Sequence, residues 1–416
     1  MPNSRASRTP VNFGPDWSHW PNRSLGSADP AVIGHHAGTH RTISPDETWQ
    51  AVQPLLSAAG ITRVADLTWL DNLGIPTVQA VRPASLTVSV SQGKATSYRA
   101  AQVSAVMESL EYWHAENATA DLWFTSTDDL NSALTYDPGL LSRPPGSFYH
   151  RGAKLDWMVA TTLLTGRRTW VPWSVVAVDV SVNDRWGPPM FTVHTQGLAA
   201  GNSYYEAALH GLYEIMERHA MGTAVAGSTM WEVRPQDLDG ADGTDLVDRV
   251  HRAGSELRIA RLDVWKGYYC FAAELISPTS SVQFGGSGLH HDPNVALSRA
   301  ITEAAQSRLT AISGTREDLP STIYERLAEA PAVTSARTAT HIPVATPTSW
   351  RAPSTDSLPA LVTAAATAVA ERTGIEPVAV VCDFPGACVP VVKVVAPGLS
   401  LSSIASPMRT PLQEIG

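Results

Sequence analysis

The clearest hydrophobic pattern in the chain predicts a helix between Gly201 and Ala220, where the sequence reads GNSYYEAALHGLYEIMERHA. On an ideal helix each residue turns the chain by about 100°. Glu206, Glu214 and Glu217 therefore share one stripe about 80° wide, and the leucines, isoleucine and methionine cover the opposite side. We expect an amphipathic helix with one buried face and one acidic face.

An acidic helix face is most often a solvated surface, and local chemistry explains part of this one. Ser203 and Glu206 have the spacing of a capping box, and Glu214 with Arg218 makes an i,i+4 pair. Glu217 has no basic residue four positions away. This observation, and the recurrence of the pattern in two further predicted helices, weakens the solvated interpretation.

Two further helices carry carboxylates. The segment VSAVMESLEYWHAE places Glu108 and Glu111 on one face, without Lys or Arg three or four positions from either. A third helix opens on Asp292 as N-cap and presents Glu303 and Gln306 on one side. An ordinary Arg299–Glu303 pair would account for the third helix, at only a few tenths of a kcal/mol.

Other patterns predict strands and one more helix. Strict alternation in LTVSVS, residues 86–91, predicts a half-buried strand that ends before the loop Gln92-Gly93-Lys94. Ser44, followed by Pro and then Glu47, predicts a capped helix that ends before Gly60, with a kink expected at Pro54. Further strands are predicted within residues 61–81, 270–277, 377–384 and 389–399. Without a regular βαβ cadence, the fold class is α/β in the sense of mixed α+β.

The predicted organisation is an irregular N-terminal arm over residues 1–38, one domain over 39–400 and a C-terminal tail over 401–416. Residues 330–357 are expected to be loop-like. His290-His291-Asp292 could form a metal corner, but a loop before a capped helix is favoured by roughly four to one on the cap pattern. Cys382 and Cys388 are expected in the core or in a loop.

Composition narrows the possible partners. A net charge of -9 argues against nucleic acid as a main partner, and no apolar run is long enough to cross a membrane. Three cysteines without a CxxC support neither a disulfide framework nor a zinc knuckle. With no recognisable secretion signal, a cytoplasmic location is expected.

If the three acidic helices converge in the fold, their glutamates would form one cluster of carboxylates. Their carboxylates would repel one another, and cations or raised pKa values would have to relieve that repulsion. Oxygen-only ligands favour Mg²⁺, and so many carboxylates favour two or more ions that bridge phosphates. No Walker A motif is present, so any nucleotide site is unconventional.

These segments resemble the YcaO family. The resemblance rests on four stretches in the expected order, namely GTHRTISPDETW with GITRVADLTWLDNLGIP, SQGKATSYRAAQVSAVMESLEYWHAE, GLAAGNSYYEAALHGLYEIMERHA and GLHHDPNVALSRAITEAAQSRLTAISGTREDL. It implies a YcaO-like fold with an ATP site built from acidic helices beside a mixed sheet. It also implies an enzyme that uses ATP and Mg²⁺ to phosphorylate a backbone amide oxygen of a ribosomally made precursor peptide.

The resemblance also implies residue roles. The magnesium ions would be held by Glu108, Glu111, Glu206, Glu214, Glu217 and Glu303, of which Glu108, Glu206 and Glu217 would be catalytic. The nucleotide would be contacted by Asn202, Gln306 and Arg308, with Lys94 and Arg218 neutralising phosphate. Ala105 and Tyr112 depart from the Ser and Arg of a full SxxExxER form, which puts those secondary contacts in doubt.

The product is left open among related chemistries. A Cys, Ser or Thr side chain that attacks the activated amide gives an azoline, a peptide amine gives an amidine, and a sulfur source gives a thioamide. The tail SPMRTPLQEIG lacks a PxPxP ending, which points away from the commonest azoline subgroup. Intramolecular cyclodehydration to a thiazoline or macrocyclic amidine is preferred. The alternatives are thioamide formation with a TfuA partner and a non-catalytic scaffold that binds peptide or nucleotide.

Partners follow from the same resemblance. The precursor peptide is the expected substrate, and its leader would be recognised by a separate protein, a TfuA protein among the possibilities, or by this chain's own surface. A homo-oligomer is possible.

Overall fold

The computed structural model describes residues 24–401 apart from 119–121, 179–187, 189, 226–227, 235–236, 238–240, 329–341, 345–354 and 388. Most of the predicted arm, most of the 330–357 loop and the tail beyond residue 401 lie outside this part of the chain. Residues 34–36, which the sequence placed in the arm, form strand β1. Within the described residues, no helix has both the length and the apolar character needed to cross a bilayer.

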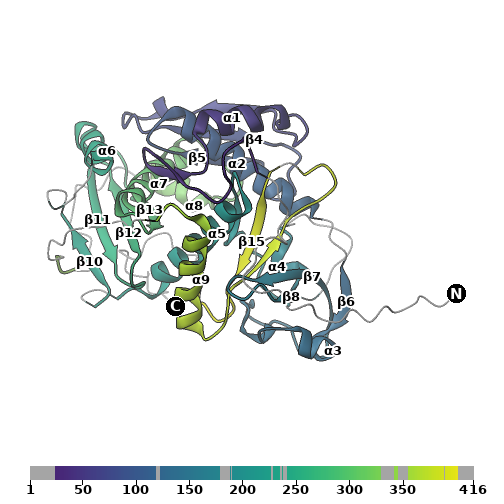
Figure 1. Cartoon of the computed structure of the whole chain (residues 1–416). Coiled ribbons are helices and arrows are strands. Elements are labelled where there is room, and N and C mark those ends of the chain that lie inside the picture. Colours follow the sequence, from purple (N-terminus) through teal and green to yellow (C-terminus); the bar gives the residue numbers. More distant parts are fainter. Residues whose placement is uncertain are drawn as a thin grey trace.

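Three layers make up the fold, and each pairs one long helix with one antiparallel sheet (Figure 1). The mixed α/β class is confirmed, but the predicted mixed sheet is not found, because every ladder between the described strands is antiparallel. The layout is therefore of the α+β kind.

The first layer is a three-stranded sheet covered by helix α2. Its strands pair in the order β3 (Arg63–Asp66), β4 (Thr77–Val81) and β5 (Val90–Lys94), and α2 spans Tyr98–Asn117. The Ser97 side chain caps α2 by accepting the Ala100 backbone N–H. The predicted strand at 86–91 was misplaced, because the ladder with β4 begins at Val90 and runs through Gln92 to Lys94.

The second layer is a six-stranded sheet against helix α5 (Tyr204–Thr223). The strand order is β6 (Trp123–Ser126), β7 (Lys154–Thr162), β14 (Val378–Val381), β15 (Val391–Val395) and β9 (Leu198–Ala200), with β8 (Arg168–Pro172) also paired to β7. Helix α9 (Leu358–Thr373) packs beside α5. Ser203 caps α5 as predicted, but the Glu206 side chain turns elsewhere, so only half of the capping box forms.

The third layer is a four-stranded sheet covered by helix α7 (Pro293–Ser313). Its strands pair in the order β10 (Met230–Val233), β11 (Glu256–Leu262), β12 (Tyr269–Ile276) and β13 (Phe284–His290). The Asp292 cap of α7 is confirmed, since its carboxylate accepts the Asn294 and Val295 backbone N–H groups. Helix α6 (Ala241–Arg252) packs on α7.

Smaller elements complete the described part of the fold. They are β2 (Thr39–Arg41), α1 (Pro45–Val52), η2 (Gln53–Leu55), η3 (Thr68–Leu70), α3 (Thr127–Leu130), η4 (Asn131–Ala133), η5 (Pro138–Leu140), α4 (Trp173–Val176) and α8 (Ser321–Ala328). The Ser44–Glu47 capping box of α1 forms as predicted. The helix ends at Val52 rather than before Gly60, because Pro54 falls where a continuing helix would need its N–H.

Glycines let two of the long helices lie very close to their sheets. A Cβ on Gly93 of β5 would meet the backbone of Ala101 and Ala105 in α2, well inside van der Waals distance. A Cβ on Gly286 of β13 would meet the backbone of Ala300 and Ala304 in α7 in the same way. The close approach fixes the height of α2 and α7 above their sheets, and therefore the position of the carboxylates on them.

Candidate active site

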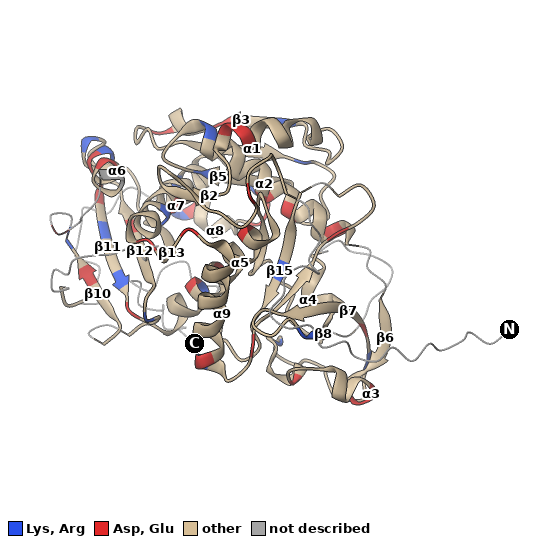
Figure 2. Cartoon of the chain, viewed as in Figure 1, with Lys and Arg blue, Asp and Glu red and all other residues tan. Residues whose placement is uncertain are grey.

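A cavity of about 380 Å³ opens where α2, α5 and α7 face one another. Figure 2 shows acidic segments of α2 and α5 near the centre of the molecule, where the layers meet. Strand β2 and the residues after it close one side of the cavity. The convergence of three acidic helices, which was only a condition in the sequence argument, is thus found in the structure.

Nearly all of the predicted site residues line this cavity. They are Lys94, Glu108, Glu111, Asn202, Glu206, Glu214, Glu217, Arg218, Glu303 and Gln306. Arg308 does not line it, because its guanidinium lies 3.2 Å from the buried carboxylate of Asp71. Five residues beyond Glu303, Arg308 is turned about 140° around α7, away from the acidic face.

Three carboxylates share one arrangement, in which a backbone N–H from a strand or its flank holds one oxygen. Glu108 accepts the Gln92 N–H at 2.9 Å, Glu111 the Ala200 N–H at 2.7 Å and Glu214 the Gly197 N–H at 2.9 Å. The second oxygen of each has no hydrogen-bond partner among the described residues. The sheets therefore orient these side chains and leave one oxygen of each for another ligand.

Burial makes these three carboxylates reluctant to ionise. Burial raises the pKa of Glu108, and that of Glu111 rises well above the ordinary carboxyl value for the same reason, with Glu108 and Glu214 adding repulsion. Burial likewise raises the pKa of Glu214, against the opposing effect of Arg218. A cation among them would relieve both the desolvation and the repulsion.

Glu206 and Glu217 differ from these three, because hydrogen bonds reach both of their oxygens. The Glu206 carboxylate accepts from Thr42 and Asn202, and Arg41 lies 3.4 Å away. The Glu217 carboxylate accepts from the Ser287 hydroxyl at 2.6 Å and the Leu289 N–H at 3.0 Å.

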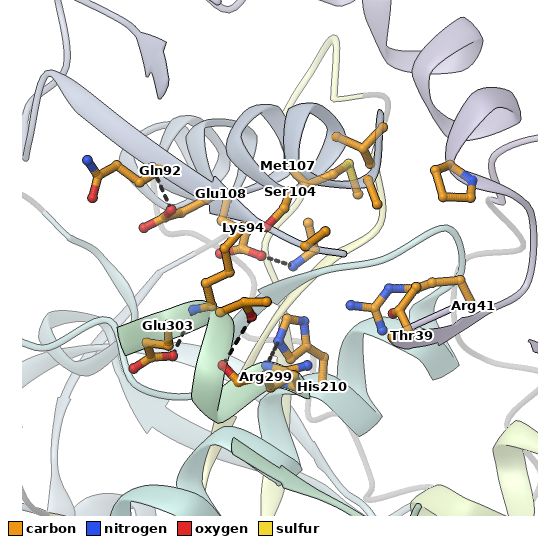
Figure 3. Close-up of a pocket in the computed structure, with 18 of the residues that line it drawn as sticks. Thr39, Arg41, Gln92, Lys94, Ser104, Met107, Glu108, His210, Arg299 and Glu303 are labelled. Carbon is orange, nitrogen blue, oxygen red and sulfur yellow. Dashed lines mark hydrogen bonds and ion pairs between the residues drawn. The ribbon is translucent and has the colours of Figure 1, made fainter. Parts of the chain in front are cut away.

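Glu303 is already paired with a cation. The Lys94 Nζ donates to it at 2.7 Å across the cavity, as Figure 3 shows. Burial opposes ionisation of Glu303, yet Lys94 and Arg218 together hold its pKa below the ordinary value. Lys94 thus joins β5 of the first layer to α7 of the third.

Several residues of the cavity wall were not predicted from the sequence. Arg41, His210, Arg299 and Arg316 all line it. A signal for His210 was present, because it lies four residues after Glu206 and four before Glu214, on the same stripe of α5. Arg299 does not form the expected pair with Glu303 and instead donates to His210 at 3.0 Å.

Three buried histidines lie beside this site. His290 ends β13, and His291 precedes the α7 cap, so the predicted loop before a capped helix is present. With His40 of β2 they form a group whose candidate ligand nitrogens lie within 4.8 Å of one another. His290 Nδ1, however, already accepts the Asp292 N–H at 2.9 Å. In the neutral ring the other nitrogen then carries the proton and cannot ligate a metal.

The cysteine thiols in the described part of the chain, those of Cys270 and Cys382, are both buried. Cys382 is fully buried, and burial raises its pKa to about 12, as expected for a core residue. Cys388 lies outside the described residues.

The donor set of the cavity suits Mg²⁺ bound to phosphate. The carboxylates with an unpartnered oxygen supply hard oxygen ligands only, which Mg²⁺ prefers, and no thiolate lines the cavity among the described residues. Lys94, Arg41, Arg218, Arg299 and Arg316 stand around the same space. Cations beside carboxylates fit an anionic ligand bridged by metal ions.

The chain belongs to the YcaO family. The family model, described as YcaO cyclodehydratase, ATP- and Mg²⁺-binding, matches residues 92–400. The resemblance drawn from the acidic helices is thereby confirmed, and ATP and Mg²⁺ are the cofactors of the family.

The chain is also similar to individual proteins and to a solved structure. An uncharacterized protein of Mycobacterium tuberculosis is 68% identical over 412 residues, covering 99% of this chain and 94% of that protein. An uncharacterized protein in the tfuA 3' region of Rhizobium leguminosarum bv. trifolii is 38% identical over 303 residues, covering 69% of this chain and 71% of that protein. The structure of YcaO from Methanopyrus kandleri bound with AMPPCP and Mg²⁺ superposes with a TM-score of 0.66 at 22% identity, covering 89% and 95% of the two chains.

Proposed function

We propose that this chain uses ATP and Mg²⁺ to activate a backbone amide of a ribosomally made precursor peptide by phosphorylating its oxygen. The amide carbon is then attacked from within the peptide, giving a thiazoline or a macrocyclic amidine. The observation that carries the proposal is the triad Glu108, Glu111 and Glu214, each with one oxygen held by the backbone and the other without a partner among the described residues.

In this proposal the carboxylates divide the work. Glu108, Glu111 and Glu214 would hold Mg²⁺, and Glu303 would be available as a further ligand if Lys94 paired with a phosphate instead. Glu206 and Glu217, with both oxygens engaged, keep α5 in place against β2 and β13 while they face the metal ions. Asn202, Gln306 and Arg218 line the same cavity and would contact the nucleotide. The bound metal ions would neutralise charge on the transferring phosphoryl group.

A second product is supported by one specific observation. The Rhizobium relative is named for its place beside tfuA, which fits thioamide formation with a TfuA partner. In that case an external sulfur nucleophile replaces the amide oxygen. The activation step and the residues that serve it are the same.

Mass spectrometry of the product tests the proposal. The protein is incubated with ATP, Mg²⁺ and the precursor peptide encoded beside its gene, with and without a neighbouring TfuA protein and sulfide. Loss of one water is expected for cyclisation, and replacement of oxygen by sulfur would show thioamidation instead. An unchanged peptide together with no ATP consumption would contradict both.

A matched pair of variants links the chemistry to the site. Glu111→Gln removes a charged ligand from the cavity and should lower peptide-dependent phosphate release by about 10²-fold or more, as loss of charge stabilisation at a reacting phosphate does. Glu371→Gln changes an exposed glutamate on α9 in the same way and should leave the rate unchanged. Equal rates of phosphate release for the two variants would show that Glu111 is not a metal ligand.

A further inference from the structure

His210 is the one histidine among the described residues that line the large cavity. Arg299 donates to its Nε2 at 3.0 Å. A guanidinium can only donate, so this nitrogen accepts, and in the neutral ring the proton is on Nδ1. That Nδ1 is buried and has no hydrogen-bond partner among the described residues. A buried donor without a partner is costly and needs an explanation.

A second, much smaller cavity touches the other side of His210. Its volume is about 10 Å³, close to the least that one water molecule needs. Its lining combines apolar residues, Ile33, Leu209 and Leu358, with polar and charged ones, His40, Arg41, Glu206, His210, Tyr213, His290 and Arg299. Several polar groups in such a small space can supply the hydrogen-bond partners that a buried water needs.

His40, across this small cavity, presents the same problem as His210. It is only 8% exposed, and its Nδ1 is also buried without a partner in the part of the chain that the structure describes. One water between the two rings would accept the proton of His210 Nδ1 and donate to His40 Nδ1. Both orphaned nitrogens would then be satisfied by a single molecule.

From His40 a hydrogen-bonded path continues to the surface. His40 Nε2 lies 3.2 Å from His35 Nδ1, and His35 Nε2 lies 2.9 Å from Asp356 Oδ1. The side chains of His35 and Asp356 are 59% and 69% exposed. If His40 and His35 carry their protons on Nε2, every donor from His210 to Asp356 meets an acceptor, so one set of tautomers satisfies the whole path.

We propose that His210 takes up the proton of the attacking group in the reaction and passes a proton through a buried water, His40 and His35 to Asp356 and solvent. This inference rests on the proposed function for its chemistry. The hydrogen-bonded path itself is a separate structural claim.

The step balances in atoms and charge. The X–H group of the peptide gives its proton to His210 Nε2 as the C–X bond forms, and the carbonyl π pair moves to oxygen, which takes the γ-phosphoryl group as ADP leaves. The His210 Nδ1 proton passes to the water, and each relay group hands on one proton and receives one. Asp356 delivers the last proton to solvent.

The surroundings of His210 suit this role. Burial and the neighbouring Arg299, Arg41 and Lys94 hold the pKa of His210 well below its ordinary value, so the ring is neutral at neutral pH. Its Nε2 becomes available when Arg299, which lines the same cavity, turns from the imidazole to a stronger anionic partner such as a phosphate. The carboxylates of the cavity are engaged by hydrogen bonds or by Lys94, and in the proposed function they bind metal, so the imidazole is the group left to take the proton.

Two measurements on the unaltered protein test the path without any peptide. A high-resolution crystal structure should show one water within hydrogen-bond distance of the Nδ1 atoms of both His210 and His40. Proton–nitrogen correlation spectra of histidine-labelled protein should show His210 protonated at Nδ1 and His40 at Nε2. A dry cavity, the opposite tautomers, or a transition metal bound stoichiometrically at His40 and His291 would each overturn the path.

Kinetics test the proton role. His210→Gln should lower kcat for phosphate release with the precursor peptide by about 10²-fold while leaving MgATP affinity little changed. His35→Ala, at an exposed position where folding is safe, should lower kcat less and should be rescued by imidazole in the buffer, which a structural role would not produce. The matched control is His251→Ala, exposed on α6, which should have no effect.

The outcomes of the two tests are distinguishable. Unchanged kcat in His210→Gln, or no imidazole rescue of a slowed His35→Ala, would overturn the relay. No turnover by the unaltered protein would overturn the proposed function and with it the proton role, while the water and the tautomers would still decide whether the path exists.

Discussion

At the residue scale, the hydrogen-bond partners of each glutamate distinguish its role. The residue type alone does not, because all six are glutamates. Glutamates that look equivalent on the helix stripes have different surroundings. Glu108, Glu111 and Glu214 each offer one oxygen, Glu206 and Glu217 offer none that is unengaged, and Glu303 holds a lysine. We therefore expect the first three to be the strongest metal ligands of the set.

Raised pKa values give a test at the same scale. Because burial raises the pKa of Glu108, Glu111 and Glu214, the folded protein binds more protons than the unfolded chain between the ordinary carboxyl range and the raised values. Stability without metal should therefore fall as pH rises through that window, and Mg²⁺ binding should release protons and strengthen with pH. Calorimetry in buffers of different ionisation enthalpy measures the protons released.

Glu111→Gln supplies the comparison for this prediction. It removes one titrating ligand, so the number of protons released should drop by about one. A Mg²⁺ affinity that does not change with pH would show that these carboxylates are ionised before the metal arrives.

The direction in which a side chain points could be predicted from the sequence where helix geometry alone determines it. The acidic stripe of α5 and the position of Gln306 follow from a turn of 100° per residue. The same turn directs Arg308 away from Glu303, which is why Arg308 does not line the cavity as predicted. His210 was identifiable on the stripe. Its pairing with Arg299 was not, because that contact joins α5 to α7 across 89 residues of chain.

At the element scale, close helix–sheet contact controls the site. Gly93→Ala should destabilise the protein by about 1–3 kcal/mol, the usual range for overpacking, because the new methyl group meets the α2 backbone and not a movable side chain. It should also weaken MgATP binding, since α2 carries Glu108 and Glu111. Chemical denaturation and nucleotide titration measure the two effects.

The control is Gly152→Ala, at an exposed glycine where the new methyl group would make only ordinary contacts. Its stability should change by less than about 0.5 kcal/mol. A Gly93→Ala variant as stable as this control would mean that α2 can rise from its sheet without cost.

The close contact between β5 and α2 also explains why the position of β5 was predicted wrongly from the sequence. Alternation in LTVSVS suggested a strand ending at Ser91, whereas the ladder runs from Val90 to Lys94. Gly and Lys have low intrinsic strand preference, and the segment is held in the sheet by its pairing with β4 and by the close contact of Gly93 with α2. Helix caps, which depend on neighbouring residues, were predicted at Ser44, Ser203 and Asp292, and the structure confirms all three.

At the scale of the whole molecule, the site belongs to no single layer. Lys94 comes from the first layer, Glu214 from the second and Glu303 from the third. Each acidic helix face could be predicted from the sequence. The packing of the three faces around one cavity could not, because it depends on contacts between residues far apart in the chain. The family resemblance supplied that part of the prediction.

A ligand that bridges the layers should stabilise all of them together. MgATP at 100 times its dissociation constant should raise the free energy of unfolding by about 2.7 kcal/mol, and hydrogen exchange should slow in α2, α5 and α7 alike. ATP without Mg²⁺ should do much less, because the carboxylates would then face the phosphates unshielded. Protection confined to one helix would place the nucleotide elsewhere.

The backbone amides that anchor Glu108, Glu111 and Glu214 have a consequence for how this site can vary. An amide donor survives any substitution except proline, so the side chains at Gln92, Gly197 and Ala200 are not what holds these glutamates. Hydrogen bonding therefore leaves homologous chains free to vary at positions 92 and 200, while Gly197, with a φ of +81° and a Cβ position that would meet the Val394 backbone, and the glutamates on the helices stay fixed. A search for relatives of this kind should give weight to the spacing of acidic residues on helices and little to the strands beneath them.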